Sequence, residues 1–249
     1  MEYHVLASGS KGNSIFIYDQ GNGLLIDCGI SRKQLLYKLK QLGFQENDIH
    51  YVLLTHDHYD HNKNIFIFDQ NIVYCGKGCI KGISPSHEFV DYEQIQLDHY
   101  QITPLPISHD ATSPFAFVIE GNKETLLYMT DTGYVSQKNM KYMCNLDYYI
   151  FESNHDVEML MATKRPLFLK NRIYGDKGHL NNEYSANVMV QVIGDRTKEI
   201  CLAHLSQEAN TKEKALQTYH QVFDENQIEF RNIKVASQVD VVSGGHHED

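Results

Sequence analysis

The first half of the chain alternates short apolar runs with turns rich in Gly, Ser and Asn, a pattern that predicts strands. The expected strands cover residues 3–7, 15–18, 24–27, 51–54, 72–75, 94–97 and 101–107. The Gly-rich turn over 8–14 lacks the spacing of a phosphate loop, so we expect a tight hairpin that could border a site. Ser31 can cap a helix, which ends near Leu42 and carries Leu35, Leu36 and Leu39 on one face.

The second half mixes strands with helices. Strands are predicted over 115–120, 125–129, 146–151, 199–203 and 229–235, and helices over 182–193 and 212–223. Residues 157–180 show no clear period and are expected to be irregular. They carry five basic residues and one acid in the stretch 164–177, which could bind a nucleic-acid backbone or simply be a solvated loop. No linker divides the chain, so we expect a single domain over 1–243 and a flexible tail over 244–249.

Polar residues with metal-ligand chemistry follow several of these strands. The densest group, Thr55-His56-Asp57-His58-Tyr59-Asp60-His61, comes directly after the apolar run at 51–54. Imidazole nitrogens and carboxylate oxygens are the usual ligands of zinc and related divalent metals. Other strands also end in such residues, namely Asp27, His109, Asp131, Glu152 and His204. Because sites are often built where strand ends converge, the pattern favours a metal site over a solvated polar turn.

Composition narrows the class of protein to which the chain can belong. The net charge of −10 argues against a generally basic nucleic-acid binder, and 42% hydrophobic with 22% charged residues is typical of a globular protein. The five cysteines are scattered and form no CxxC pair, which favours reduced thiols over a disulfide framework or a cysteine-type zinc site. The sequence shows no signal peptide and no apolar run near the roughly 18 residues of a membrane span. We therefore expect a cytoplasmic protein with no membrane partner.

The order His56-x-His58-x-Asp60-His61, then His109, Asp131 and His204, resembles the metal motifs of the metallo-β-lactamase superfamily. The resemblance implies an α/β fold, a four-layer αββα sandwich with the site on one edge between two sheets. It implies two divalent metal ions, the first held by His56, His58 and His109. The second would be held by Asp60, His61 and His204, with Asp131 bridging the two and Asp27 orienting a ligand. Asp57 and Tyr59 would then not be ligands.

A finer resemblance is to the WalJ/YycJ-like branch, close to tRNase Z and the phosphodiesterase-type members. It rests on the segments 6–14, 25–29, 152–156, 178–182 and 204–206. The resemblance implies that Glu152 and His179 form a catalytic pair outside the metal shell, and that the substrate is DNA attacked from an end. Cys28, Asn62 and Asn64 depart from the residues usual in the family, but none of the three is a ligand.

Phosphodiester hydrolysis needs a nucleophile, charge stabilisation and a proton for the leaving oxygen. Two metal ions can activate a bridging hydroxide and stabilise the phosphoryl charge, and this ligand set does not choose among zinc, manganese and iron. Asp60 would serve in the metal shell, and His179 is the candidate general acid, with Glu152 fixing its tautomer. We predict a two-metal nuclease that acts on DNA more than on RNA.

The residues also allow two alternative functions. The same bimetal site could hydrolyse a thioester or a lactone, or the chain could be a metal-bound binding module without turnover. The role of His155 is open between a contact near the site and a surface position.

Overall fold

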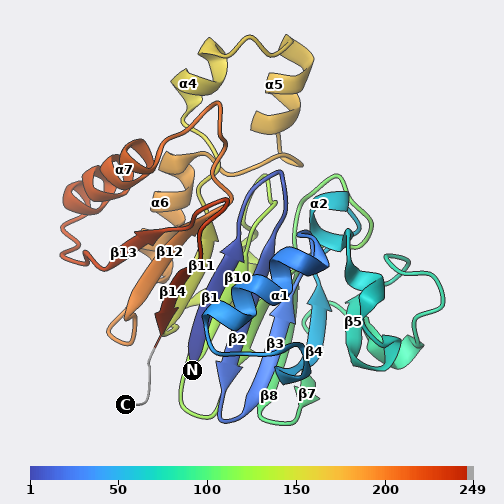
Figure 1. The fold of residues 1–249 in the computed structure, drawn as a ribbon. Coiled ribbons are helices and arrows are strands. Elements are labelled where there is room, and N and C mark those ends of the chain that lie inside the picture. The colour runs from blue at the N-terminus through green and yellow to red at the C-terminus, as the bar shows by residue number, and fades with distance from the viewer. Residues whose placement is uncertain (246–249) are drawn as a thin grey trace. The chain divides into compact units, whose positions relative to one another are not determined.

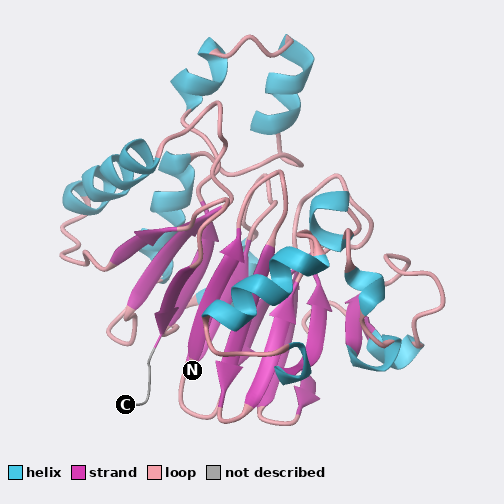
Figure 2. Cartoon of the chain, in the orientation of Figure 1, coloured by secondary structure: helices cyan, strands magenta, loops and turns pink. Residues whose placement is uncertain are grey.

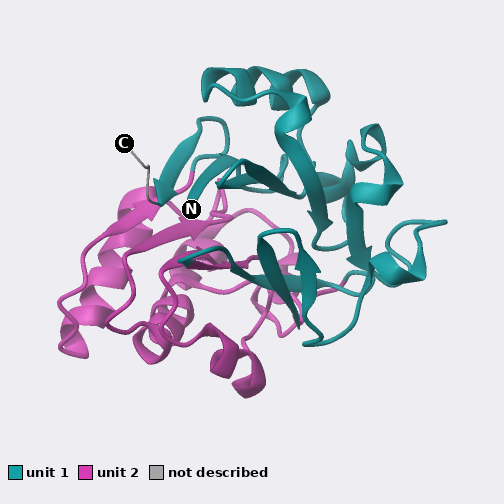
Figure 3. Cartoon of the chain, turned by 90° about the horizontal axis from the view of Figure 1, so that it is seen from below, with its two compact units in different colours: residues 1–106, 111–124, 237–249 teal, residues 107–110, 125–236 magenta. Residues whose placement is uncertain are grey.

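The computed structural model describes residues 1–245, which form two compact units (Figure 3). Unit 1 comprises residues 1–106, 111–124 and the described residues from 237 onward. Unit 2 comprises residues 107–110 and 125–236. None of the helices within residues 1–245 is long and apolar enough to cross a bilayer.

Unit 1 is built on a seven-stranded sheet in the order β14-β1-β2-β3-β4-β5-β6 (Figure 2). Its strands are β1 (Glu2–Ala7), β2 (Ser14–Asp19), β3 (Asn22–Ile26), β4 (Ile49–Leu54), β5 (Val73–Gly76), β6 (Glu88–Phe89) and β14 (Val242–Gly245). The pairs β1–β2 and β2–β3 are antiparallel, whereas β3–β4, β4–β5 and β5–β6 are parallel. Because β3 and β4 run in the same direction, the loops that follow them leave the same edge of the sheet.

The helix α1 (Arg32–Gln41) lies across one face of this sheet (Figure 1). Ser31 caps it, and the side chain of Gln34 completes a capping box, as the sequence pattern predicts. The buried Leu35 and Leu39 pack into an apolar cluster with residues of the sheet such as Phe16 and Val52. This cluster forms the core beneath the loops that follow β3 and β4.

Unit 1 also contains three further strands and several short helical turns. An antiparallel group contains β7 (Ile95–Leu97), β8 (Tyr100–Pro106) and β9 (Phe115–Glu120). The single-turn helix α2 (Tyr59–Asn62) follows the His-rich loop. Short 3₁₀ turns cover Glu46–Asp48, Ile65–Ile67, Gln70–Ile72 and Pro85–His87.

Unit 2 contains four parallel strands with helices around them. The strands are β10 (Thr125–Met129), β11 (Tyr148–Glu152), β12 (Glu199–Ala203) and β13 (Ile233–Val235), paired in that order. The helices are α3 (Gln137–Met143), α4 (Val157–Ala162), α5 (Leu167–Tyr174), α6 (Asn182–Val192) and α7 (Lys212–Glu225). Neighbouring parallel strands end at one edge, so Asp131, Glu152 and His204 leave the sheet side by side.

Three sequence predictions differ from the structure. The expectation that 157–180 is irregular is wrong, because Asp156 caps α4 and Pro166 precedes α5. These helices have six and eight residues, which is too short for a helical period to stand out. The strand expected over 229–235 is confined to β13. The tail expected from 244 begins inside β14, where Gly244 pairs with Tyr3, and residues 246–249 lie outside the described residues.

Candidate functional site

Three loops of unit 1 are hydrogen-bonded together at the end of β4. The backbone N–H of Asn13 donates to the carbonyl of Asp60 at 2.8 Å, and that of Cys28 donates to the carbonyl of His61 at 2.8 Å. The N–H of Gly29 donates to the carbonyl of Asn13 at 2.9 Å. A Cβ at Gly29 would lie 1.7 Å from the carbonyl oxygen of Asp60, so only glycine permits this approach. The Gly-rich turn before β2 is thus part of the scaffold that fixes the His-rich loop.

A buried hydrogen-bond network orients two of the histidines from unit 1. Asp27 is fully buried, and its Oδ2 accepts from Nδ1 of His61 at 2.7 Å. The hydroxyl of Thr55 lies 2.9 Å from the same oxygen and 3.0 Å from Nδ1 of His56. Because the single hydroxyl proton of Thr55 goes to the carboxylate, the Thr55 oxygen accepts from His56. Nε2 is therefore the nitrogen that carries the lone pair in both His56 and His61.

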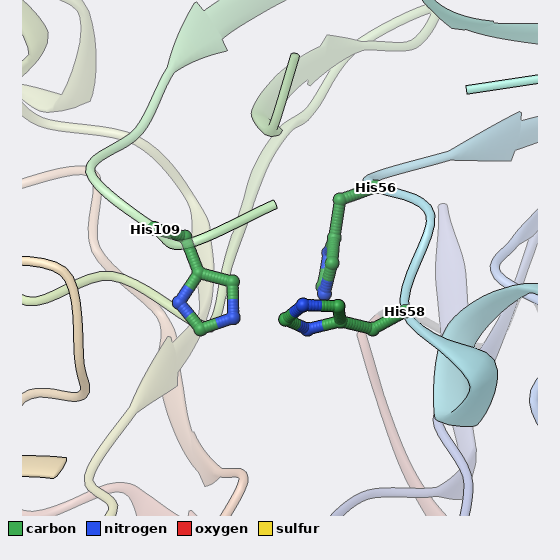
Figure 4. A group of neighbouring side chains, drawn as sticks. All are labelled: His56, His58 and His109. Carbon is green, nitrogen blue, oxygen red and sulfur yellow. The ribbon is translucent and has the colours of Figure 1, made fainter. Parts of the chain in front are cut away.

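The other candidate ligands of unit 1 lie on the same loop. The ring centroid of His56 is 4.7 Å from that of His58 and 4.0 Å from that of His61. Figure 4 shows His56 and His58 on the loop between β4 and α2, and His109 on the loop that follows β8. Oδ1 of Asp57, which the sequence did not predict as a ligand, accepts from the backbone N–H of Thr112 at 2.9 Å.

Asn13 also faces the metal-ligand atoms, a contact that the sequence did not reveal. Its Nδ2 lies 2.9 Å from Nε2 of His61 and 3.4 Å from Oδ2 of Asp60. Its Oδ1 accepts from the N–H of Gly9 at 2.8 Å, which fixes the orientation of the amide. The only available signal was the position of Asn13 in a Gly-rich turn.

Glu152 organises the corresponding part of unit 2. This carboxylate is fully buried at the end of β11. Its Oε1 lies 2.8 Å from Nδ1 of His179 and 3.0 Å from Nδ1 of His204. Its Oε2 accepts from the backbone N–H groups of Thr132 and Leu180, both at 3.1 Å. Since a carboxylate only accepts, both rings carry their proton on Nδ1 and present Nε2 as the basic nitrogen.

Burial would raise the pKa of Glu152, but the nearby His179 and the hydrogen bonds from His179 and His204 outweigh it and lower the pKa to about 2. The Glu152 side chain is therefore a carboxylate at neutral pH. In unit 1, burial raises the pKa of Asp27, while His61 and Thr55 oppose the shift.

Asp131 and His109 complete the group in unit 2. Oδ1 of Asp131 lies 3.6 Å from Nδ1 of His179, 3.5 Å from Nδ1 of His204 and 3.9 Å from Nε2 of His109. Four side chains each offer one nitrogen or oxygen atom that could bind a metal, and these four atoms lie within 4.8 Å of one another. The side chains are those of Asp131, Glu152, His179 and His204. Unit 2 therefore brings together all five of its predicted site residues.

Three of the strand-end residues have left-handed backbones although none is glycine. The φ angles are 61° at Asp27, 59° at Asp131 and 57° at His204. Such conformations cost energy in residues with a Cβ, and they concentrate at functional sites. Here they turn the chain sharply at the end of β3, β10 and β12, which places the side chain at the sheet edge.

The donor sets of both units fit divalent metal ions. Each contains imidazole and carboxylate groups, the ligands that zinc, manganese and iron share. His61 and His204 each have Nδ1 held by a buried carboxylate, an arrangement that is typical of metal-ligating histidines. His155 differs, because the ring is buried and neither nitrogen has a hydrogen-bond partner within residues 1–245. Its surface role, one of the two options left open, is therefore excluded.

Comparisons with known proteins agree with this picture. Residues 22–204 match the family model of the beta-lactamase superfamily domain. The chain is 35% identical over 237 residues to exodeoxyribonuclease YycJ of Bacillus anthracis, and the match covers 90% of each chain. It is 35% identical over 234 residues to exodeoxyribonuclease WalJ of Streptococcus pneumoniae, covering 87% of this chain and 86% of that protein.

Solved structures show the same fold at low sequence identity. The metallo-beta-lactamase fold protein YhfI from Bacillus subtilis superposes with a TM-score of 0.71 at 18% identity, covering 98% of this chain and 99% of that one. Human tRNase Z, short form, gives a TM-score of 0.65 at 16% identity, covering 97% and 98%. These similarities confirm the predicted fold class, an α/β metallo-β-lactamase sandwich.

Proposed function

Because the chain belongs to the metallo-β-lactamase superfamily, in its WalJ/YycJ-like branch, we propose that it is a metal-dependent hydrolase that cleaves phosphodiester bonds at the ends of DNA. The two relatives at 35% identity are both named exodeoxyribonucleases, which supports DNA over RNA as the substrate. The observation that carries the proposal is the pair formed by Glu152 and His179, which has the chemistry of a proton donor for a leaving oxygen.

The proposed ligand set follows the motif order of the family. In that order His56, His58 and His109 would hold the first ion, and Asp60, His61 and His204 would hold the second. Asp131 would be a ligand shared by the two ions. The support is the donor chemistry in each unit and the carboxylates that hold Nδ1 of His61 and His204. The ions are zinc or manganese, with iron also compatible, and when bound they supply an activated water and positive charge for the phosphoryl oxygens.

The residues outside the ligand set handle the proton. Glu152 holds Nδ1–H of His179, so Nε2 is the atom that can carry a proton to the leaving oxygen. The carboxylate also stabilises the ring when the ring is positively charged. The side chain of His179 is 21% exposed, whereas that of His204 is 2% exposed, so His179 is the ring that substrate can reach. Asp60 contributes to catalysis as a ligand.

The proposal is tested with purified protein supplied with manganese or zinc. The substrates are end-labelled single- and double-stranded DNA, RNA, bis(p-nitrophenyl) phosphate, a thioester and a lactone. We expect progressive shortening of DNA from an end and loss of this activity in Asp131→Ala. Asp195→Ala, a change of an exposed aspartate in the same unit, is the matched control and should retain activity.

The proposal fails if the wild-type protein cleaves none of the phosphodiesters, or if Asp131→Ala cleaves them equally well. Faster hydrolysis of the thioester or lactone than of any phosphodiester would assign the site to the alternative reaction. Metal binding without turnover of any substrate would identify a binding module.

A further inference from the structure

The segment 157–178, here called the α4–α5 segment, exposes an unusual amount of apolar surface. Of the twelve large hydrophobic side chains that are exposed among the described residues, four fall in its 14-residue stretch from 161 to 174. They are Met161 at 43%, Leu167 at 68%, Phe168 at 74% and Tyr174 at 52% exposure. A concentration of exposed apolar side chains adds nothing to folding and marks a surface that meets a partner.

The opposite side of the segment holds it in place. Ile173 of α5 and Leu160 of α4 are buried together with Ala209, and Leu169 packs against them. This small cluster accounts for the inward-facing residues of both helices. Leu167 and Phe168, at the start of α5, are outside it and are accessible.

Basic residues are interleaved with the exposed apolar ones. The α4–α5 segment contains five Lys or Arg against two acids, a net charge of +3, whereas the whole chain carries −10. Arg165 pairs with Glu208 at 3.1 Å and Arg172 with Asp110 at 2.6 Å. Lys164 and Lys177 are exposed, and within residues 1–245 neither forms an ion pair.

This combination points to one class of partner. Single-stranded nucleic acids are bound by aromatic side chains that stack on bases and by cations that contact the phosphates. A second copy of this chain is a poorer partner. If the same segment of both copies met, two segments of charge +3 would face each other. If any other surface met it, the exposed lysines would lie in a protein–protein interface, where lysine is depleted. The charge of the α4–α5 segment is therefore complementary to a nucleic acid.

The segment is also attached to the candidate catalytic residues of unit 2. The N–H of His179 donates to the carbonyl of Ile173 at 2.9 Å. Asp110, which forms an ion pair with Arg172, directly follows His109 in the chain. Asp176 packs closely against Gly133, where a Cβ would lie 2.2 Å from the carbonyl oxygen of Asp176. Figure 1 shows that α4 and α5, which belong to unit 2, lie past the end of its strand β11. A single-stranded nucleic acid bound along the α4–α5 segment would therefore extend toward His179.

We propose that the α4–α5 segment binds the single-stranded end of the DNA substrate, with bases stacked on Phe168 and Tyr174 and phosphates near Lys164 and Lys177. This inference rests on the proposed function and adds the part of the molecule that captures the strand. It accounts for the exposed aromatic side chains and exposed lysines that this segment carries on an otherwise acidic chain.

Binding is measured apart from cleavage, by fluorescence anisotropy of a labelled single-stranded oligodeoxynucleotide with EDTA present. Loss of one stacked base weakens binding about tenfold, so Phe168→Ala should raise Kd and KM for single-stranded DNA by about that factor. Its turnover of bis(p-nitrophenyl) phosphate should equal that of wild type. Tyr37→Ala removes an aromatic side chain of 62% exposure on α1 and is the matched control.

The lysines are tested by the salt dependence of binding. The double variant Lys164→Gln/Lys177→Gln should reduce the slope of log K against log salt by about 1.4, since each phosphate contact with a single strand contributes about 0.7. Lys33→Gln/Lys40→Gln removes two exposed charges from α1 and should leave the slope unchanged.

The outcomes separate the two proposals. If wild type cleaves DNA and Phe168→Ala binds and cleaves it equally well, the α4–α5 inference is overturned while the proposed function stands. If Phe168→Ala changes the oligomeric state and leaves Kd for DNA unchanged, the segment is an interface between copies and the inference is also overturned. If wild type binds through Phe168 but cleaves nothing, the proposed function fails and this inference is supported.

Discussion

Replacing Glu152 with Gln removes one acceptor atom from a carboxylate that serves four donors. Oε1 lies 2.8 Å from Nδ1 of His179 and 3.0 Å from Nδ1 of His204, and Oε2 accepts two backbone N–H groups at 3.1 Å. An amide has a single oxygen, so its NH₂ must face either the two rings or the two backbone donors. In the first case both rings must change tautomer, which puts a proton on Nε2 of His204. In the second case two buried N–H groups lose their acceptor.

Either arrangement has a cost that can be estimated. A buried donor without an acceptor costs about 1–3 kcal/mol, so the loss of two acceptors should lower the free energy of unfolding of metal-free protein by about 2–6 kcal/mol. Loss of the group that orients a ligating histidine typically weakens metal binding about 10–100-fold. Loss of an oriented general acid lowers kcat by about 10²–10⁴, measured on DNA.

Three measurements check these values for Glu152→Gln. Urea denaturation followed by circular dichroism gives the unfolding free energy, competition with a chelating dye gives the metal affinity, and end-labelled DNA gives kcat. Glu158→Gln, an exposed glutamate on α4, is the matched control and should behave as wild type. If Glu152→Gln keeps wild-type metal affinity and kcat, the assignment of Glu152 as the organising residue is refuted.

Three further predictions concern stability and ligand orientation. Gly29→Ala should lower the free energy of unfolding by about 2 kcal/mol or more in urea denaturation, because its Cβ would lie 1.7 Å from the Asp60 carbonyl, and an unchanged midpoint would refute this. Thr55→Val keeps the shape but removes the hydroxyl between Asp27 and His56, so metal affinity in dye competition should fall about tenfold, and unaltered affinity would contradict the network. Burial lowers the pKa of His155 to about 4, so the folded state loses stability as the pH falls from about 6.5 to about 4, by about 3 kcal/mol. In urea titrations, His155→Gln should abolish this part of the pH dependence, and an unchanged pH profile would show that His155 does not cause it.

The sequence predicted those features that depend on local pattern. Asp27, Asp131 and His204 follow apolar runs, and the parallel pairing of β3–β4 and of β10–β12 brings such strand ends to a common edge. The capped helix α1 was predicted for the same reason, since Ser31 and the leucine spacing are local signals.

Other features depend on contacts between residues far apart in the chain. Asn13 contacts His61, 48 positions away in the sequence, and Glu152 contacts His204, 52 positions away. Hydrophobic periodicity does not predict contacts between residues so far apart in the sequence. The helices α4 and α5 were missed because they are short and are stabilised by Ala209, which lies far along the chain. Local sequence patterns therefore indicate which residues have ligand chemistry, but they do not indicate the long-range contacts that hold those residues in place.

The role of His179 as general acid is tested by comparing two substrates in His179→Ala. Cleavage of DNA releases an alkoxide that needs a proton, whereas p-nitrophenolate is a weak base that leaves without one. If His179 is the general acid, kcat on DNA should fall about 10²–10⁴-fold, turnover of bis(p-nitrophenyl) phosphate should fall much less, and the metal content should equal that of wild type. An equal loss on both substrates, or loss of bound metal, would contradict this role and identify His179 as a ligand.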